Sequence, residues 1–548
     1  MQKKQTILVV ASLLVVVLSV TLAYFTAQII GKGKDVSVSS ADLKIIFTDT
    51  DGNIEGNDIT PGWSNSKTFT VKNESNETYK YNIVIQDLVN TFVTNGYLQY
   101  KITSTNGGYN MTEFKDVPKS ETATDTILAY SASIDVGVTQ SYTVEFKYAN
   151  DESVDQSEDM GKILSGKLFI TEGTEEPVTL LSQLLADKST VLTRTDFSKV
   201  LTNDNTNTLY TSTEYSKTVY YFAGNATDNW VKFGKYQNDL IRYRGYYDST
   251  TTTNYHEYST MDECTSASSY NVNCTEYKYA NTGDDIYWRI IRTNSDGSVK
   301  LLYHGTSTTA TDAYIGESAF NETYNDPMYV GYMYGTSGSL ASNRDNTNNS
   351  TIKTYIDNWY NNNLSSYSKY ISTTAVYCND RELAPGSTYK TGKTSFFYAP
   401  SGRLHTNKTP TYNCANIKDA FSGSNSEAKL TYPIGLMTAD EVSFAGGVYN
   451  TNAETWYYKN SANGSSTGST LWWLLSPIYW SNEYIYEPDV FNVVGSSSPG
   501  ELNFYSTNVH YARGVRPAIS LKFCTLYSTG NGTSETPYEI VLDPNISC

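Results

Sequence analysis

Basic clusters, metal-binding cysteine motifs and histidine pairs are scarce in this chain of 548 residues. Beyond the N-terminus no run of Lys or Arg occurs, and the formal net charge is −17. Because phosphate backbones are bound by basic faces, no nucleic-acid partner is expected. The six cysteines include no CxxC pair, and no two of the four histidines stand at ligand spacing. Zinc-ribbon and thioredoxin-like sites are therefore not indicated.

Catalytic signatures are also missing. No HExxH occurs, and the GSSTG at 464–468 fits GxSxG only within a Ser/Gly loop that lacks the required strand and helix. The GSTYKTGKT at 386–394 misses the Walker A spacing by one residue. A Ser-His-Asp triad is defined by geometry rather than spacing and stays open. We therefore expect a non-enzymatic protein, with an extracellular enzyme as the alternative.

Tyrosine is abundant, with 48 residues, and aromatic residues make up 14% of the chain. Hydrophobic residues at 39% and charged residues at 18% exclude a disordered chain. Tyrosine favours strands and interfaces, although codon bias explains its abundance equally well. An acidic, Ser/Thr/Asn-rich composition is typical of a solvated extracellular protein.

Residues 1–34 are predicted to be a signal peptide or a signal anchor. Lys3 and Lys4 precede an almost unbroken apolar run from Ile7 to Phe25, which is long enough to span a bilayer. Cleavage and retention both stay open. In either case the rest of the chain lies on the extracellular face of the cell membrane or is secreted, and an uncleaved helix would hold it to the membrane.

Residues 35–173 are predicted to form an all-β, jelly-roll-like sandwich. Short strand-like runs at 43–47, 67–71, 79–85, 141–146 and 167–170 are separated by turn residues. The segments AYFTA (23–27), SSADLKI (39–45) and ITPGWSNSKTFTVKNES (59–75) resemble the camelysin/TasA family. That family contains exported β-sandwich proteins of Gram-positive bacteria, some of which form matrix fibres. The resemblance implies a stalk or fibre module that could self-assemble.

Residues 174–181 form a predicted linker, and residues 182–548 a second domain with an insertion at about 235–284. Within it, 287–292 and 299–303 predict a β-hairpin, and the apolar stripe in 351–370 predicts a helix. Thr438 and Glu441 form a capping box at the start of a shorter helix. A further short helix is expected at 180–185.

Seven motifs of this second domain resemble an uncharacterised Gram-positive bacterial surface domain. They are NWVKFG (229–234), YWRIIR (287–292), IDNWY (356–360), CNDR (378–381), IGLMTADEVSFAGG (434–447), WWLLSP (472–477) and GVRPAISL (514–521). Their order is similar to the formylglycine-generating-enzyme type of C-type-lectin-like fold. The resemblance implies an α+β domain with two helices, a mixed sheet and displayed loops. That fold hosts enzymes, lectins and hypervariable binding proteins, so it does not decide function.

In an exported protein the six cysteines are expected to form disulfides. The pairing that closes the shortest loops joins Cys264 with Cys274, Cys378 with Cys414 and Cys524 with Cys548, while other connectivities stay open. Local pairing would consume the thiols that an oxidase of the formylglycine-generating type needs.

A polar, aromatic insert between the apolar runs 471–477 and 514–522 is expected to be the displayed ligand-binding surface. Its candidate ligand-binding residues are Tyr479, Trp480, Tyr484, Tyr486, Asn492, Asn508, His510 and Tyr511. Tyr, Ser, Gly and Asn together are typical of antibody paratopes, although half of these side chains could instead pack beneath the loop.

Glu487-Pro488-Asp489 mixes two lectin tripeptides and could hold calcium through Glu487 and Asp489, or could form an ordinary turn. No other cofactor is expected. The leading hypothesis is a cell-surface protein whose C-terminal head binds an extracellular glycan or protein, with the β-sandwich as stalk. A purely structural matrix component is a further alternative.

Overall fold

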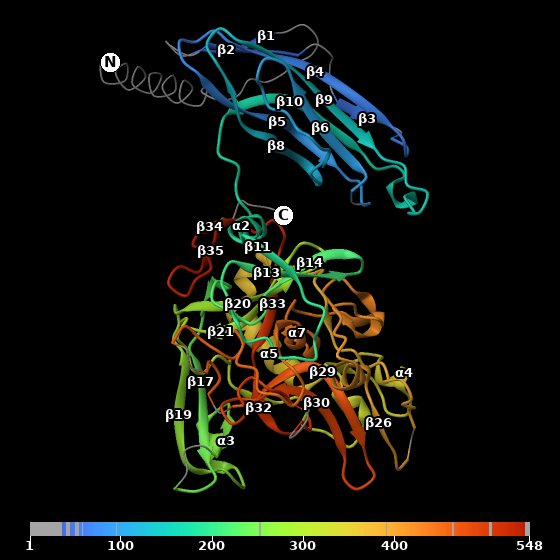
Figure 1. Ribbon diagram of the computed structural model, residues 1–548, viewed down its shortest axis with the longest axis vertical. Coiled ribbons are helices and arrows are strands. Elements are labelled where there is room, and N and C mark those ends of the chain that lie inside the picture. The colour runs from blue at the N-terminus through green and yellow to red at the C-terminus, as the bar shows by residue number, and fades with distance from the viewer. Residues whose placement is uncertain are drawn as a thin grey trace, which may run out of the picture. The chain divides into compact units, whose positions relative to one another are not determined.

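The computed structural model describes residues 35–39, 44–49, 54–56, 59–94, 96–250, 254–390, 392–462, 465–468, 470–503 and 507–542 (Figure 1). The chain divides between Glu176 and Pro177 into two compact units, and this boundary falls inside the predicted linker. No helix within the described ranges is long and apolar enough to cross a membrane. The predicted signal or anchor segment, residues 1–34, lies outside these ranges.

The N-terminal unit is built from two antiparallel sheets that pack as a sandwich. One sheet has the order β1-β2-β4-β9-β6-β7 and the other β3-β10-β5-β8. The strands are β1 (Asp35–Ser39), β2 (Lys44–Asp49), β3 (Ile54–Gly56), β4 (Ser64–Asn73), β5 (Tyr79–Asn90), β6 (Leu98–Ser104), β7 (Lys115–Asp116), β8 (Ser120–Ile134), β9 (Thr139–Tyr148) and β10 (Leu164–Glu172). The predicted all-β architecture of this part is confirmed.

Alternation along the strands explains this sandwich. In β9 the even positions Tyr142, Val144 and Phe146 are buried, and the residues between them face outward. Because successive side chains of a strand point to opposite faces, such a strand buries one face only. The buried face meets Ile83 and Leu168 of the second sheet in a single hydrophobic core.

A mixed ten-stranded sheet forms the centre of the C-terminal unit. Its strands are β11 (Thr190–Thr193), β13 (Thr208–Glu214), β14 (Lys217–Tyr221), β16 (Trp230–Lys235), β20 (Asp285–Thr293), β21 (Val299–Gly305), β28 (Gly435–Leu436), β33 (Pro517–Leu521), β34 (Tyr527–Thr529) and β35 (Tyr538–Ile540). The pairs β11–β13 and β16–β35 are parallel. The predicted hairpin is confirmed as β20 and β21, which turn at Gly297 with a positive φ of 81°.

Side chains cap several helices of this unit, one of them at the predicted capping box. The side chain of Ser350 caps α5, and the reciprocal Thr438–Glu441 capping box begins α7. The helices are α2 (Leu180–Asp187), α3 (Met261–Ser266), α4 (Leu340–Asn343), α5 (Thr351–Asn363), α6 (Ala399–Ser401) and α7 (Ala439–Ala445). Short 3₁₀ segments occur at Pro327–Val330, Ser365–Tyr370, Ile417–Asp419 and Ser426–Ala428, and a π-helix at Gly402–Asn407. A further 3₁₀ segment, Ser157–Asp159, belongs to the N-terminal unit. The expected helices at 180–185, 351–370 and after Thr438 are confirmed as α2, α5 with its following turn, and α7.

A buried group of charged side chains joins α7 to the central sheet. Glu441 accepts hydrogen bonds from Arg292 at 2.9 Å and from Lys300 at 2.7 Å. Arg292 also donates to Glu214 at 2.9 Å. Burial alone would raise the pKa of Glu441, but the charges of Lys300 and Arg292 lower it to about 2. The carboxylate therefore stays ionised and fixes α7 on the sheet.

A second sheet of six strands contains the predicted insert. Its strands are β22 (Glu317–Ala319), β26 (Ser395–Phe397), β29 (Trp472–Ser481), β30 (Glu487–Val493), β31 (Leu502–Asn503) and β32 (Ala512–Gly514). The insert is displayed only in part, because 487–493 forms a strand that pairs with β29 and buries Val490 and Phe491 completely. Only the tip of this hairpin, residues 482–486, projects from the sheet.

The expected insertion at about 235–284 forms a small antiparallel sheet of order β18-β17-β19 (Figure 1, green). It consists of β17 (Leu240–Tyr246), β18 (Tyr255–Tyr258) and β19 (Val272–Ala280). The Cys264–Cys274 disulfide ties α3 to β19. A Cβ on Gly245 would lie 1.9 Å from the carbonyl oxygen of Tyr270, so only glycine allows this close approach. Short two-stranded pairs are β12 (Asp204–Asn205) with β15 (Asn225–Ala226), β23 (Met333–Tyr334) with β24 (Asn348–Asn349), and β25 (Tyr377–Cys378) with β27 (Ala420–Phe421).

Candidate functional site

A cleft with a volume of about 570 Å³ lies between the small β17–β19 sheet and strands β22 and β32. We call it the tyrosine cleft. Its aromatic and charged lining residues are Arg244, Tyr255, His256, Tyr270, Tyr277, Asp312, Tyr314, Glu317, Tyr511 and Arg513. Small-molecule sites typically measure roughly 300–1,000 Å³, so the cleft has the size of a ligand site.

Arg244 organises one wall of the tyrosine cleft. Its guanidinium lies 3.4 Å from the ring centroid of Tyr277 and 4.4 Å from that of Tyr255. Nε donates to Glu257 at 3.0 Å, and Nη2 donates to the hydroxyl of Tyr279 at 2.6 Å. The guanidinium is held in place by the two ring faces and by the Glu257 carboxylate. It therefore fixes the orientation of the surrounding tyrosines before a ligand binds.

The carboxylate of Glu257 links the two walls. It accepts from the backbone N–H of Glu317 at 2.8 Å and from the hydroxyl of Tyr279 at 2.6 Å. Burial, followed by the negative charge of Glu257, raises the pKa of Glu317 to about 8. The raised pKa favours the protonated carboxyl, which can donate as well as accept a hydrogen bond in the cleft.

A row of aromatic rings extends the cleft at its mouth. The ring of His510 lies 4.3 Å from that of Tyr511 and 4.3 Å from that of Tyr324, measured between centroids. The guanidinium of Arg513 lies 5.0 Å from the Tyr511 centroid. Tyr511 and Tyr324 are both exposed. Rigid rings of this kind offer contact area at a low cost in conformational entropy.

The structure separates the ligand-binding residues expected from the sequence. Tyr511 lines the tyrosine cleft, and His510 packs beside it half-buried. Tyr484 is 95% exposed at the hairpin tip and Tyr486 is 48% exposed, but neither lines the cleft. Tyr479 is half-buried, with its ring 4.7 Å from that of Phe397 on the adjacent strand β26.

Three of the expected residues are buried in the sheet. Trp480 is only 2% exposed, Asn492 is fully buried, and Asn508 is nearly so. The side-chain amide of Asn508 donates to the carbonyl of Tyr486 at 2.8 Å, and Asn492 accepts from Asn503 at 3.2 Å. Asn508 thus fixes the hairpin tip and Asn492 joins β30 to β31, while the Trp480 ring is buried, so all three side chains belong to the framework of the sheet.

Glu487 and Asp489 lie on one face of strand β30, so the alternative of an ordinary turn is also wrong. Burial, and then the charge of Glu487, raises the pKa of Asp489 to about 7. Calcium takes six to eight oxygen ligands. Within the described ranges no group of three or more His, Cys, Asp or Glu side chains could hold a metal ion. The two carboxylates alone do not fit the expected calcium site.

Comparisons with known proteins supply no family for this chain. No family model matches it, and no curated protein matches it. One similar solved chain comes from a study titled "Chaperone-tip adhesin complex is vital for synergistic activation of CFA/I fimbriae biogenesis", with 12% identity over 44% of this chain and 86% of that chain. Another is the class 5 fimbriae chaperone CfaA, with 12% identity over 46% and 92%. Both TM-scores are 0.08, a value at which the likeness carries no argument.

Two predicted disulfides are confirmed. Cys264 pairs with Cys274 at a Cα separation of 6.1 Å, and Cys378 pairs with Cys414 at 5.6 Å. Cys524 is also disulfide-bonded, whereas its expected partner, residue 548, lies outside the described ranges. Among the described cysteines there is no free thiol.

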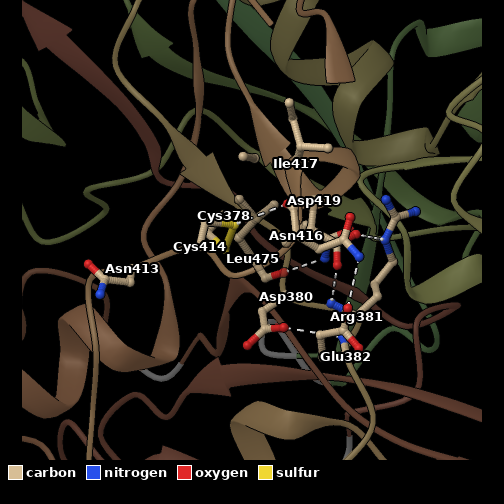
Figure 2. The surroundings of a disulfide bond; sticks show 12 residues. Cys378, Asp380, Arg381, Glu382, Asn413, Cys414, Asn416, Ile417, Asp419 and Leu475 are labelled. Carbon is tan, nitrogen blue, oxygen red and sulfur yellow. Dashed lines mark hydrogen bonds and ion pairs between the residues drawn. A yellow bond between two sulfur atoms is a disulfide. The ribbon is translucent and has the colours of Figure 1, made fainter. Parts of the chain in front are cut away.

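The CNDR motif around one of these disulfides has a structural role (Figure 2). Arg381 lies beside Asp419, to which its Nε donates at 2.7 Å, and both side chains are buried. The amide of Asn379 donates to the carbonyl of Leu475 in β29 at 2.7 Å. The Cys378 disulfide therefore anchors a loop whose buried polar groups support strand β29.

Reasoning from the sequence missed most of the tyrosine cleft. Arg244, Tyr255 and Tyr277 come from the insertion, whereas Asp312 and Glu317 come from a segment after β21. The available signal was the dense Tyr and Arg pattern of RYRGYY at 242–247 and EYKYA at 276–280. That pattern alone does not predict the cleft, because nothing in the sequence indicates that the insertion faces residues 511–513.

Proposed function

We propose that this chain is an exported cell-surface protein whose C-terminal unit binds an extracellular glycan in the tyrosine cleft. The observation that carries the proposal is the cleft itself, a cavity of about 570 Å³ lined by tyrosine rings and by charges of both signs. Its pre-arranged rings offer flat apolar contacts, and its carboxyl and guanidinium groups can accept from and donate to sugar hydroxyls.

A glycan fits these features better than a protein partner does. Stable protein interfaces bury about 800 Å² on each partner, commonly over a broad surface. The tyrosine cleft is instead a concavity, with exposed aromatic residues gathered at its mouth in Tyr324 and Tyr511. A single extended sugar chain can enter the cleft and continue along this row of rings.

The wider architecture is part of the same proposal. The mixed sheet, the helices α5 and α7 and the peripheral sheets support a C-type-lectin-like unit related to the formylglycine-generating type. In such folds variable peripheral segments carry the ligand site. The N-terminal sandwich would act as a stalk or fibre module of the camelysin/TasA kind, outside the cell membrane. Concentration-dependent filaments of the purified protein, seen by electron microscopy, would support self-assembly.

The test is a pair of matched substitutions on the whole protein. Tyr511→Ala removes an exposed ring of the cleft, and Tyr484→Ala removes an exposed ring at the hairpin tip. After a glycan-array screen identifies a ligand, we expect Tyr511→Ala to weaken its binding at least tenfold, as central aromatic contacts do. Tyr484→Ala should leave the affinity unchanged. The reverse pattern, measured by calorimetry, would place the binding surface at the hairpin tip.

One observation favours a second candidate, an extracellular glycan-cleaving enzyme. Glu317, whose pKa is raised, and Asp312 line the same cleft, and glycoside hydrolysis uses one carboxylic acid and one carboxylate. Glu317→Gln separates the two functions. A binding protein would keep its affinity for the glycan, whereas an enzyme would release reducing ends as the wild type and lose this turnover in the variant.

A further inference from the structure

A second cavity of about 420 Å³ lies elsewhere in the C-terminal unit and shares no lining residue with the tyrosine cleft. We call it the arginine cavity, because the buried side chain of Arg289 forms part of its wall. Asp204 and Lys459 bring one charge of each sign to the lining. Hydroxyl and amide side chains, among them Thr206 and Asn225, make up much of the rest.

Arg289 is held without a carboxylate partner in the described part of the chain. Its guanidinium donates to the side chain of Asn229 at 2.6 Å and to the carbonyls of Ala226 at 2.8 Å and Lys459 at 3.1 Å. These bonds use three of its five N–H groups. The guanidinium also lies 4.0 Å from the ring centroid of Trp230. The other two N–H groups have no acceptor among the described residues and can serve a further one.

Among the described residues, the two charged groups that act most strongly on Arg289 do not balance its charge. Asp228 acts on it electrostatically, but that carboxylate is already paired with Lys188 at 2.6 Å. Arg516, whose charge also acts on Arg289, donates only to the carbonyls of Tyr303 and Tyr457 within the described residues. Buried charges are normally paired, because an uncompensated ion loses its hydration without replacement.

His304 is affected by the same two positive charges, those of Arg289 and Arg516. It is fully buried, its ring lies 4.3 Å from Trp230, and neither ring nitrogen has a hydrogen-bond partner among the described residues. Burial, together with the charges of Arg289 and Arg516, lowers the pKa of His304 well below its ordinary value. The histidine is therefore neutral and adds no third positive charge, but it also supplies no negative one.

We propose that the arginine cavity binds an oxyanion carried on a small hydroxylated molecule, the chemistry of an acidic monosaccharide. An oxyanion beside Arg289 would satisfy its remaining N–H groups and balance the buried charge. A cavity of about 420 Å³ exceeds the size of a bare inorganic oxyanion and has room for a sugar ring. The Thr and Asn side chains of the lining suit its hydroxyl groups. This site is independent of the function proposed for the tyrosine cleft.

The probes are glucuronate, neutral glucose, and inorganic sulfate and phosphate, titrated into the whole protein by calorimetry. We expect glucuronate to bind at least tenfold more tightly than glucose, and sulfate or phosphate to compete with it weakly. If glucose and glucuronate bind equally, the cavity does not recognise an oxyanion. If inorganic anions bind more tightly than glucuronate, the cavity does not recognise a sugar.

Rim variants test the charge without disturbing the core, since Arg289 itself is buried. Asp204→Asn keeps the oxygen that accepts from Asn225 at 2.6 Å and removes a repelling charge, so glucuronate should bind about threefold to tenfold more tightly. Lys459→Gln removes an attracting charge beside Glu454 and should weaken binding by a similar factor.

Two control substitutions on an exposed ion pair outside the cavity carry the same charge changes. Asp196→Asn and Lys199→Gln break a pair of 3.3 Å that does not line the cavity, and both should leave glucuronate binding unchanged. An Asp204→Asn variant that binds no more tightly than Asp196→Asn would overturn the proposal. Tyr511→Ala should not alter glucuronate binding, so failure of this site and failure of the tyrosine cleft are told apart.

Discussion

Replacing Glu317 by glutamine should remove a pH-dependent loss of stability from the C-terminal unit. In the folded protein, burial and the charge of Glu257 raise the pKa of Glu317 from 4.5 to about 8. Between these two values the folded state holds a proton that the unfolded chain has lost. Stability must therefore fall as pH rises from about 4.5 to about 8 and become level above that window.

The size of the effect follows from the shift. Each pKa unit corresponds to about 1.4 kcal/mol, so ionisation of the unfolded chain between pH 4.5 and pH 7 destabilises the wild type by about 3–4 kcal/mol through this residue. Glutamine resembles the neutral carboxyl and does not titrate. The stability of Glu317→Gln should therefore not fall with pH through this residue. Its free energy of unfolding relative to the wild type should rise steadily from pH 5 to pH 7.

Guanidinium unfolding followed by tryptophan fluorescence measures this difference, since every tryptophan except Trp63 lies after Pro177. Glu322→Gln, at a nearby exposed position, is the matched control and should follow the wild type at every pH. A difference between wild type and Glu317→Gln that stays constant from pH 5 to pH 8 would refute the reasoning. It would show that Glu317 is ionised when folded, balanced by Arg244 and Arg513.

Three further predictions concern the framework of the C-terminal unit. Glu441→Gln leaves the buried Lys300 without its carboxylate and Arg292 with Glu214 alone, and should destabilise the unit by about 3–5 kcal/mol in urea unfolding at pH 7, a loss that should shrink as pH falls below 4.5 towards 2. Trp480→Ala should lower stability by about 3–5 kcal/mol because the ring is buried, whereas a displayed ring would give a change near zero. Cys264→Ser with Cys274→Ser should lower the melting temperature through a loss of about 2–3 kcal/mol. The same double variant should weaken glycan binding more than Tyr484→Ala does, and equal affinities would mean that the small sheet does not form the site.

Local patterns predicted much of the framework. The capping box at Thr438, the hairpin of β20 and β21, the short-range disulfides and the alternating strands of the sandwich all appear as expected. Each depends on residues within a few positions of one another or on a strict alternation. Such signals survive in the sequence because backbone hydrogen bonding and capping are local.

The insert shows where this reasoning failed. The insert between the apolar runs 471–477 and 514–522 was expected to display its aromatic residues, with packing beneath the loop as the alternative. In the structure β30 pairs with β29, Pro488 lies opposite Trp480, and Trp480 is buried. Tyrosine and asparagine suit both buried and exposed positions, so composition alone does not separate a paratope-like loop from a packed hairpin. Only the partner strand decides which face is covered.

The sequence by itself determined the two-part division of the chain, the β-rich character of both units, the capped helices and two of the disulfides. Tertiary structure alone decided the sites. The tyrosine cleft needs Arg244, Glu317 and Tyr511, which are widely separated in the chain, and the arginine cavity needs Arg289 and Lys459. Such sites arise from long-range packing. The burial that raises the pKa of Glu317, and that encloses Arg289 without a carboxylate partner among the described residues, exists only once distant strands have come together.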